Sequence, residues 1–389
     1  MTIKSRFTSA SLMAALIAAI LLTSAATIVS QRAELTVHEW GTFTTVSRAD
    51  GKAQIWRPLS GPSELPGFVY RSRQVQEEDQ CSKCSWALAR METPVLYFYS
   101  DREMNVSVKI GFPRGKITEW YPQSRAVNPG IIWDNLTVLP GAQATFPVDQ
   151  RKSHYYPARE TDASPIRVGS EPQAEYEKFL FYRGIGDFEL PLTAGLTGDQ
   201  LRMSNSWQDE IAQVFVFENR DGQIGWNAHG PFKGRLSLAR PKLGQQNVES
   251  LHHELEATLI SQGLFAKEAR AMVRTWQDSW FEEGLRVFYI VPRKTTDEIL
   301  PITITPAPAN LSRVLVGRAE IITPEMEEAI AAAVKLFDEG SDESRAAAIK
   351  MVRKYGRFAG PVLTQMRSNT SNRTLQTNIF NLMNTAMKK

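Results

Sequence analysis

The pattern of apolar and polar positions divides the chain into a strand-rich part and a helix-rich part. From Glu34 to Ala239, short stretches rich in Val, Thr, Phe, Tyr and Trp alternate with turn residues, which is typical of β-strands. Asp-Gly pairs at 50–51 and 221–222 fit tight hairpin turns, because both residues tolerate positive φ. The pattern predicts a β-rich body, either a sandwich or a strongly bent sheet.

A helix-helix-strand segment follows this strand-rich part. Apolar residues recur at helical spacing near 248–262 and again near 266–283, and Gly284 favours an end to the second helix. Residues 285–291 then form a nearly continuous apolar run, as in a strand that is covered on both faces. We expect this segment to complete the core of a main domain that spans 34–322.

From Thr323 onward the composition shifts to Ala, Glu, Lys and Met. Thr323 and Pro324 form a helix-capping pair, and apolar residues then repeat at helical spacing in several short helices. The alternation resembles one or two helical repeats of the HEAT kind over 323–389. A repeat stack this short has to dock on the body or on a partner to bury its faces. The predicted fold class is therefore α+β, with a small all-α tail.

Residues 1–30 have the features of an export signal. Lys4 and Arg6 precede an apolar run from Leu12 to Leu22, and the small residues 24–26 suit cleavage. We expect a periplasmic or extracellular protein. The alternative is an uncleaved N-terminal anchor, because residues 10–29 are long enough to span a bilayer, and the membrane would then be met only through this segment.

Composition narrows the range of partners. The chain is 42% hydrophobic and 22% charged, with a formal charge of +3, which falls to +1 without Lys4 and Arg6 of the leader. This is too small to indicate nucleic-acid binding, so a protein or a cell-envelope polymer is the expected partner. With five histidines in 389 residues, we expect no cofactor, and a divalent metal remains an alternative.

The two cysteines, Cys81 and Cys84, form a C-x-x-C pair. In an exported protein they are expected to form a structural disulfide, and thiol–disulfide exchange is the alternative. Zinc would need two further ligands, and covalent haem attachment would need a histidine where Ser85 stands.

His38, Glu39 and Trp40 lie in the first strand, as candidates for ligand binding. Adjacent strand residues point to opposite faces, so His38 and Glu39 share one site only if a bulge intervenes. The plainer interpretation is a histidine that is hydrogen-bonded at a sheet face. Tyr155 and Tyr156, in a long polar loop, would suit stacking on sugars or on a partner if they are exposed.

His252 and Glu256 are four residues apart on a helix, so they are candidate metal ligands or a solvated pair. We favour the solvated pair, since the leucines of that helix define its buried face. Glu282 and Glu283 are candidate acid–base residues because they oppose the helix dipole at a C-terminus, where Arg286 could offset them. The plainer interpretation is an exposed helix end.

Three stretches, HEWGTFTTV, METPVLYFYS and WFEEGLRVFYIVPR, together resemble an uncharacterised family of exported bacterial proteins. The resemblance covers most of the chain after the leader and implies no activity, cofactor or site.

The chain contains no P-loop, dinucleotide fingerprint or G-x-S-x-G motif. We therefore expect a non-enzymatic envelope protein that binds a ligand or a protein. One alternative is an exported hydrolase, metal-assisted or not, that uses residues from the set His38, Glu39, His252, Glu282 and Glu283. A weaker alternative is thiol–disulfide exchange at Cys81 and Cys84.

Overall fold

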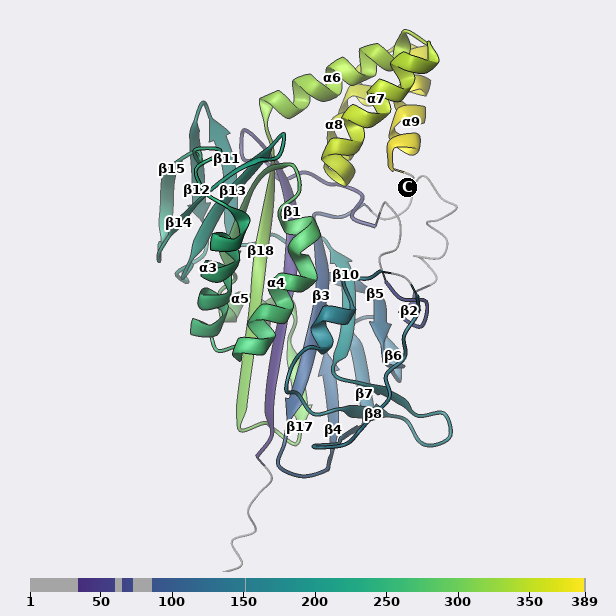
Figure 1. Cartoon of the computed structure of the whole chain (residues 1–389), viewed down its shortest axis with the longest axis vertical. Coiled ribbons are helices and arrows are strands. Elements are labelled where there is room, and N and C mark those ends of the chain that lie inside the picture. The colour runs from purple at the N-terminus through teal and green to yellow at the C-terminus, as the bar shows by residue number, and fades with distance from the viewer. Residues whose placement is uncertain (1–33, 60–64, 73–85, 151, 388–389) are drawn as a thin grey trace, which may run out of the picture. The chain divides into compact units, whose positions relative to one another are not determined.

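The structure is a computed structural model that describes residues 34–59, 65–72, 86–150 and 152–387. Residues 1–34 and 35–389 form separate units, and the fold described below is that of the second. The predicted leader and the Cys81–Cys84 pair lie outside the described residues. Figure 1 shows a mixed α/β chain in which a sheet-rich body precedes C-terminal helices, as the sequence predicts.

A nine-stranded sheet forms the centre of the body. Strands β1 and β18 pair in parallel from Thr36 opposite Asn310 to Arg48 opposite Ile322, and every other neighbouring pair is antiparallel. In sheet order the strands are β14 (Gln223–His229), β13 (Val214–Arg220), β16 (Gly284–Ile290), β18 (Asn310–Ile322), β1 (Thr36–Arg48), β3 (Ala89–Tyr99), β10 (Leu180–Gly186), β5 (Gly115–Tyr121) and β2 (Tyr70–Arg71).

Two smaller sheets contribute to the core on one side of the large sheet. Alternate residues such as Val37 and Phe43 of β1 share an apolar cluster with Trp133 and Leu201 of the smaller sheets. The six-stranded sheet contains β17 (Ile302–Thr305), β4 (Met104–Ile110), β7 (Ile131–Val138), β8 (Ile166–Val168), β9 (Glu175–Glu177) and β6 (Ala126–Val127). The three-stranded sheet contains β11 (Leu192–Thr197), β12 (Gln200–Asn205) and β15 (Gly234–Ala239).

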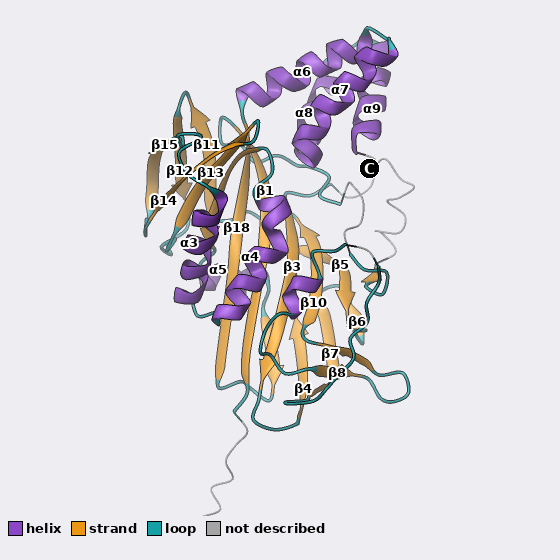
Figure 2. Ribbon diagram, in the orientation of Figure 1, coloured by secondary structure: helices purple, strands orange, loops and turns teal. Residues whose placement is uncertain are grey.

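Helices cover the other face of the large sheet, as Figure 2 shows. They are α3 (Val248–Ser261), α4 (Ala266–Trp280) and the short 3-10 helix η1 (Tyr156–Arg159). Asn247 caps α3, and both helices bury the apolar stripes expected from the sequence against Trp40 and its neighbours. Helix α5 (Arg293–Ile299) was not predicted, because its sequence RKTTDEI has no helical apolar stripe.

The C-terminal helices are α6 (Pro324–Asp338), α7 (Asp342–Tyr355), the 3-10 helix η2 (Gly356–Phe358), α8 (Ala359–Asn369) and α9 (Arg373–Met387). The Thr323 hydroxyl caps α6 by accepting from the backbone N–H of Met326 at 3.3 Å, which confirms the predicted capping pair. A third apolar cluster joins the helices to Val46, Trp56 and Ile322 of the body. No helix among the described residues is long and apolar enough to cross a membrane.

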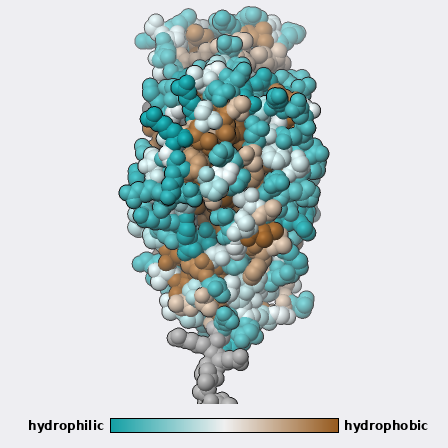
Figure 3. Space-filling model, turned by 90° about the vertical axis from the view of Figure 1, so that its left-hand side faces the viewer, coloured by the Kyte–Doolittle hydropathy of each residue, from teal (hydrophilic) through white to brown (hydrophobic). Residues whose placement is uncertain are grey.

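Strands β14 and β15 each stand at the end of a sheet. Figure 3 views this side of the molecule and shows apolar residues gathered in patches among polar ones. Leu236 and Leu238 of β15 are only half-buried there. This side therefore exposes sheet edges that are not uniformly polar.

Candidate binding site: a buried arginine cluster

Three strand ladders of the large sheet lose their regular register at one place. The shifts fall between Trp40 and Thr42 in β1, between Phe181 and Gly184 in β10 opposite β3, and beside Arg183 opposite β5. Thr93 of β3 lies at the same point with φ +48, a backbone conformation that is costly for a β-branched residue. Bulges and strained residues concentrate near functional sites, so this part of the sheet is our candidate site.

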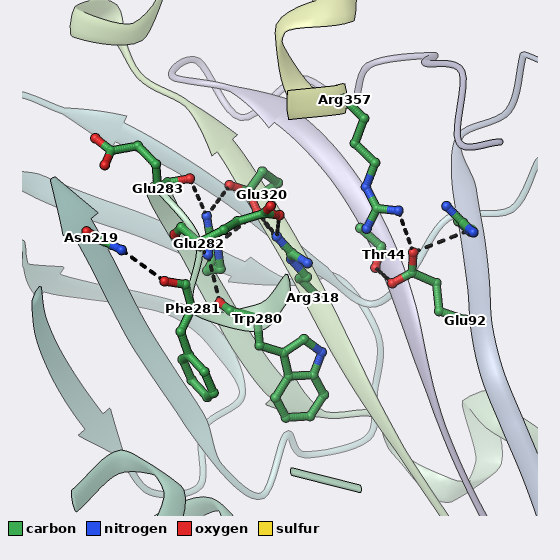
Figure 4. Close-up of polar contacts among 12 residues, drawn as sticks. Thr44, Glu92, Asn219, Trp280, Phe281, Glu282, Glu283, Arg318, Glu320 and Arg357 are labelled. Atoms are coloured by element: carbon green, nitrogen blue, oxygen red, sulfur yellow. Dashed lines mark hydrogen bonds and ion pairs between the residues drawn. The ribbon is translucent and has the colours of Figure 1, made fainter. Parts of the chain in front are cut away.

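Glu92 is the acidic centre of the site. It is 1% exposed and accepts a hydrogen bond from Thr44 Oγ1 at 2.9 Å (Figure 4). It also forms ion pairs with Arg357 Nη1 at 2.9 Å and Arg90 Nε at 3.3 Å. Burial alone would raise the pKa of Glu92, but the guanidinium groups of Arg357, Arg90 and Arg318 lower it to about 2. Glu92 is therefore ionised at neutral pH and is unsuited to act as a general acid.

Arg318 links this centre to the end of helix α4. Its Nη2 donates to Glu282 Oε1 at 2.8 Å and to Glu320 Oε2 at 3.1 Å, and its Nε donates to Glu320 at 3.2 Å. Its Nη1 is buried and has no hydrogen-bond acceptor among the described residues. The Nη1 group of Arg318 thus lacks a hydrogen-bond partner in the protein interior, which lowers the stability of the folded state.

Arg286 closes the C-terminal end of α4. Its guanidinium donates to the carbonyl oxygens of Trp280, Glu282 and Glu283, each at 2.7 Å, and to both carboxylate oxygens of Glu320 (Figure 4). A positive charge at this end of a helix offsets the negative end of its dipole. This arrangement explains why two glutamates are tolerated there, and it matches the predicted role of Arg286.

Arg183 is buried without an acidic partner at ion-pair distance among the described residues. Its Nε and Nη2 donate to the Thr93 hydroxyl at 3.1 and 3.0 Å, and its guanidinium lies 6.0 Å from the Trp276 ring centre. It is 3% exposed. Its hydrogen bonds go to one hydroxyl, its guanidinium lies against aromatic rings, and Glu92 attracts it only from beyond ion-pair distance, so the charge of this buried cation is incompletely compensated.

Further unpaired donors surround the two arginines. Thr42 Oγ1 and the indole Nε1 atoms of Trp276 and Trp280 are buried and have no acceptor within the described part of the chain. The two indoles are stacked at 6.5 Å, so they connect Arg183 to the Arg286–Arg318 side of the site. We call Thr42, Glu92, Thr93, Arg183, Trp276, Trp280, Arg318 and Arg357 the arginine cluster. The cluster is suited to donate hydrogen bonds to an anion, because Glu92, the acidic residue in it, is already paired with arginines.

The candidate acids Glu282 and Glu283 lie at the margin of this cluster. Glu282 is bound to Arg318, whereas Glu283 pairs with Lys354 of α7 at 3.0 Å and accepts from the backbone N–H of Asp221. Neither carboxylate is left free for acid–base chemistry in this arrangement. Each carboxylate joins the end of α4 to another element of the fold. They are therefore structural residues, and not simply part of the exposed helix end that we favoured.

His38 and Glu39 point to opposite faces of the sheet, as predicted. His38 Nδ1 lies 2.7 Å from Glu268 Oε2 on the α4 side, whereas Glu39 binds Tyr182 and Arg313 on the other side. Trp40 is fully buried in the core beneath α4. The register shift after Trp40 does not bring His38 and Glu39 to the same face of the sheet.

Tyr155 and Tyr156 are not the exposed pair that the polar loop suggested. Tyr155 is 1% exposed, packs against Phe179 and Phe181, and donates its hydroxyl to Glu177 Oε2 at 2.9 Å. Tyr156 is half-buried in η1. The prediction was wrong for Tyr155 because its ring completes the apolar layer between η1 and the sheet, whereas the surrounding polar residues form the surface of the loop.

The proposed metal ligands His252 and Glu256 do not meet other ligands. The His252 ring lies 4.8 Å from that of Phe281, burial lowers its pKa, and Glu256 is 3.8 Å from Arg270. In the described ranges, no group of three or more His, Cys, Asp or Glu side chains is arranged to hold a metal ion. His252 is half-buried on Phe281, so the pair is less solvated than we expected.

Glu92, Arg183, Arg318 and Arg357 were not predicted from the sequence as site residues. A signal was available for the first three, since each is a charged residue in a strand that is mostly apolar, and Arg183 is the single charge in LFYRGIG. Buried charges are rare unless they are paired or functional. Arg357 had no such signal, because it lies in a polar stretch between two helices.

No family model and no curated protein match this chain. Among solved structures, it is similar to the Mu homology domain of Fcho1 from Danio rerio with bound Eps15 peptide. The identity is 7%, the TM-score is 0.29, and the alignment covers 74% of this chain and 97% of that one. A likeness at this level says nothing about the arginine cluster.

Proposed function

We propose that this protein is an exported binding protein of the bacterial envelope that binds a small anion, a carboxylate or a phosphate, at the arginine cluster. The observation that carries the proposal is the pair Arg183 and Arg318, two buried guanidinium groups with incomplete partners. An oxyanion would accept from the free Nη1 of Arg318 and balance the charge of Arg183.

The neighbouring donors support an anion as the ligand. Thr42, Trp276 and Trp280 contribute groups that can only, or readily, donate to an oxygen. The negative charge of Glu92 would repel a bound anion, but Arg357 and Arg90 already neutralise it. The cluster is closed in this structure, with Arg183 and Arg318 at 3% and 0% exposure. The Phe358 ring of η2 lies 4.9 Å from the Arg318 guanidinium, so entry of the ligand to Arg318 requires η2 to move away.

The leader, the sheets and the C-terminal helices are each given a role that the sequence predicts. We propose export through residues 1–30, a sandwich-like arrangement of the sheets, and a HEAT-like tail formed by α6 to α9. The consecutive packing of these helices on one apolar cluster supports the last point. The surface of the tail is then available to a protein partner or an envelope polymer.

The metal-assisted hydrolase loses its support in this geometry. His38 lies at the N-terminal end of α4 and Glu282 beyond its C-terminal end, roughly 20 Å apart along a helix of this length. Glu39 faces the opposite side of the sheet. The five residues of that hypothesis therefore do not form one site.

The experiment is thermal unfolding of the full-length protein with increasing inorganic phosphate, at an ionic strength held constant with sodium chloride. A ligand that binds the folded state raises its stability with the logarithm of concentration, by about 2.7 kcal/mol at 100 times Kd. We expect this rise in the natural protein and its loss in Arg183→Met, a change that leaves no carboxylate unpaired.

Arg202→Met is the matched control, because Arg202 is exposed on β12. It should keep the response to phosphate. Equal responses of both variants, or a natural protein that does not respond to phosphate or to succinate as a carboxylate probe, would contradict the proposal.

A further inference from the structure

The charge of the chain is unevenly distributed, and its positive excess lies in the C-terminal helices. Residues 344–389 contain nine Lys and Arg and no Asp or Glu, whereas residues 1–343 contain 36 Lys and Arg against 42 Asp and Glu. A basic segment beside a larger acidic part is typical of a surface that binds an acidic partner. The low net charge of the whole chain conceals this asymmetry.

Helix α9 exposes a row of polar side chains along one face. The row consists of Arg373, Thr377, Asn381 and Thr385, all of them exposed. Residues four apart lie above one another on a helix, so the row follows one side of α9. At a rise of 1.5 Å per residue it is about 18 Å long. The opposite side of the helix is buried in the apolar cluster of the tail.

The composition of α9 is not explained by helix stability. Its 15 residues include three Thr and three Asn, which compete with the backbone for hydrogen bonds and are poor helix formers. Asn378 has a structural role, because its Nδ2 donates to Asp338 Oδ1 at 2.7 Å. The Asn381 amide has no hydrogen-bond partner among the described residues, and the Thr377 hydroxyl bonds only within its own helix, to the Arg373 carbonyl oxygen at 3.0 Å. A departure from local preference of this kind is expected where a surface contacts a partner.

Positive charges flank the row along its length. Arg373 begins it, and Arg367 of α8 lies 5.0 Å from the ring centre of Phe380 in the middle of α9. At the other end, Arg353 Nη2 of α7 donates to the carbonyl oxygen of Thr385 at 3.4 Å. In the described part of the tail, neither Arg367 nor Arg373 has a carboxylate at ion-pair distance. Cations and neutral hydrogen-bonding groups therefore alternate over this surface.

We propose that the exposed face of α9 binds a strand of an anionic polysaccharide, a polymer whose sugar rings carry carboxylates. Threonine hydroxyls and asparagine amides both donate and accept hydrogen bonds, as the hydroxyl groups of a sugar do. Guanidinium groups at intervals match carboxylates that are separated by the neutral parts of the rings. This surface is separate from the arginine cluster, and it rests on the proposed function only for the location in the envelope, where such polymers occur.

Two other acidic partners fit this surface less well. Helices that bind an anionic membrane surface also insert large apolar side chains, and the exposed large apolar side chains of the described residues all precede Ala266 in the chain. Nucleic acids present closely spaced phosphates, or bases that stack on open aromatic rings. The cations of α9 are interspersed with neutral groups, and the Phe380 ring is covered by Arg367.

The experiment is fluorescence anisotropy of end-labelled alginate oligosaccharides, titrated with the full-length protein at several sodium chloride concentrations. We expect binding that weakens as salt rises, and no binding of an uncharged dextran of the same size. In Thr377→Ala with Asn381→Ala, the affinity should fall roughly tenfold, because two hydrogen bonds are lost at constant charge. Alanine is a better helix former than either residue, so this double alanine variant should fold.

Arg367→Gln with Arg373→Gln tests the charges of the surface. This variant should bind alginate more weakly than the natural protein and with a smaller dependence on salt. Arg202→Gln with Arg235→Gln is the matched control, because it removes two exposed arginines from β12 and β15 of the body. It should bind alginate as the natural protein does.

Several results would overturn the proposal. They are absence of alginate binding, an unchanged affinity in the double alanine variant, equal weakening in the two arginine pairs, and tighter binding of a DNA duplex or of phosphatidylglycerol vesicles than of alginate. Arg183→Met, which tests the arginine cluster, should leave alginate binding unchanged, and the double alanine variant should keep the response to phosphate. The two proposals therefore fail independently of each other.

Discussion

Arg357 of the C-terminal helices reaches Glu92 of the central sheet, with Nη1 2.9 Å from Oε1 and the carboxylate 1% exposed. The tail is therefore attached to the body by a buried ion pair as well as by apolar contacts. A buried pair of this kind adds little net stability compared with a well-packed apolar pair, but it fixes one arrangement of its elements, because either partner alone would be left uncompensated.

We predict that Glu92→Gln destabilises the fold by about 3–5 kcal/mol, because Arg357 and Arg90 lose their ion-pair partner and Arg318 loses a nearby opposite charge. Denaturant unfolding followed by tryptophan fluorescence measures this change. Glu103→Gln, on an exposed loop, is the matched control and should stay within about 0.5 kcal/mol of the natural protein. Similar values for the two variants would refute a structural role for Glu92.

Glu92 also predicts the acid sensitivity of the fold. Its pKa is about 2 when folded, below its usual value of 4.5. A depressed folded pKa contributes stability that is present in full above pH 4.5 and is lost as the pH falls toward 2. The contribution is on the order of 3 kcal/mol. Melting temperatures between pH 2 and pH 6 should fall less steeply in Glu92→Gln than in the natural protein, and parallel curves would contradict this.

Arg286→Lys should destabilise the protein by several kcal/mol even though the charge is kept. A lysine has one nitrogen and cannot serve three carbonyl oxygens of α4 and both oxygens of Glu320 at once. The Trp280 indole lies in the last turn of α4, so its fluorescence should shift to the red as the helix end loosens. Urea unfolding measures the stability, and unchanged stability would show that the capping is dispensable.

Glu283→Gln should cost less than about 1 kcal/mol. The Glu283 side chain is 13% exposed, but its partner Lys354 is 32% exposed and also pairs with the exposed Asp221. This attachment of the tail is therefore partly screened by solvent and has a second acceptor. The comparison with Glu92→Gln in the same urea titration separates the buried attachment from the surface one. A large loss in Glu283→Gln would indicate that the carboxylate has a role beyond its pairing with Lys354.

The helices and most of the long strands could be predicted from local sequence. The boundaries of α3 and β16 and the start of α6 agree with the predicted apolar patterns and capping pair to within a few positions. The second helix is shorter than expected, since α4 ends at Trp280 and not before Gly284. Arg286 explains the difference in part, because it binds the carbonyl oxygens of residues 280, 282 and 283 in place of a further helical turn.

The sites could not be predicted in the same way, because they depend on strand order. Glu92 and Arg357 are far apart in the chain, as are His38 and Glu268, and only the assembled fold makes them neighbours. Local patterns favoured adjacent candidates such as Glu282 and Glu283. Arg183, the single charge in an apolar strand, and Arg318, a charge in a mostly apolar strand, were the better signal.

The parallel pairing of β1 with β18 determines when the body can be completed. During synthesis, β1 emerges before its neighbours in the sheet and can pair with β3 on one side. Its other edge has no partner until residues 310–322 arrive. Such a long sequence separation makes closure of the sheet a late and slow event, and until then the nascent chain presents an open strand edge on which a chaperone can act.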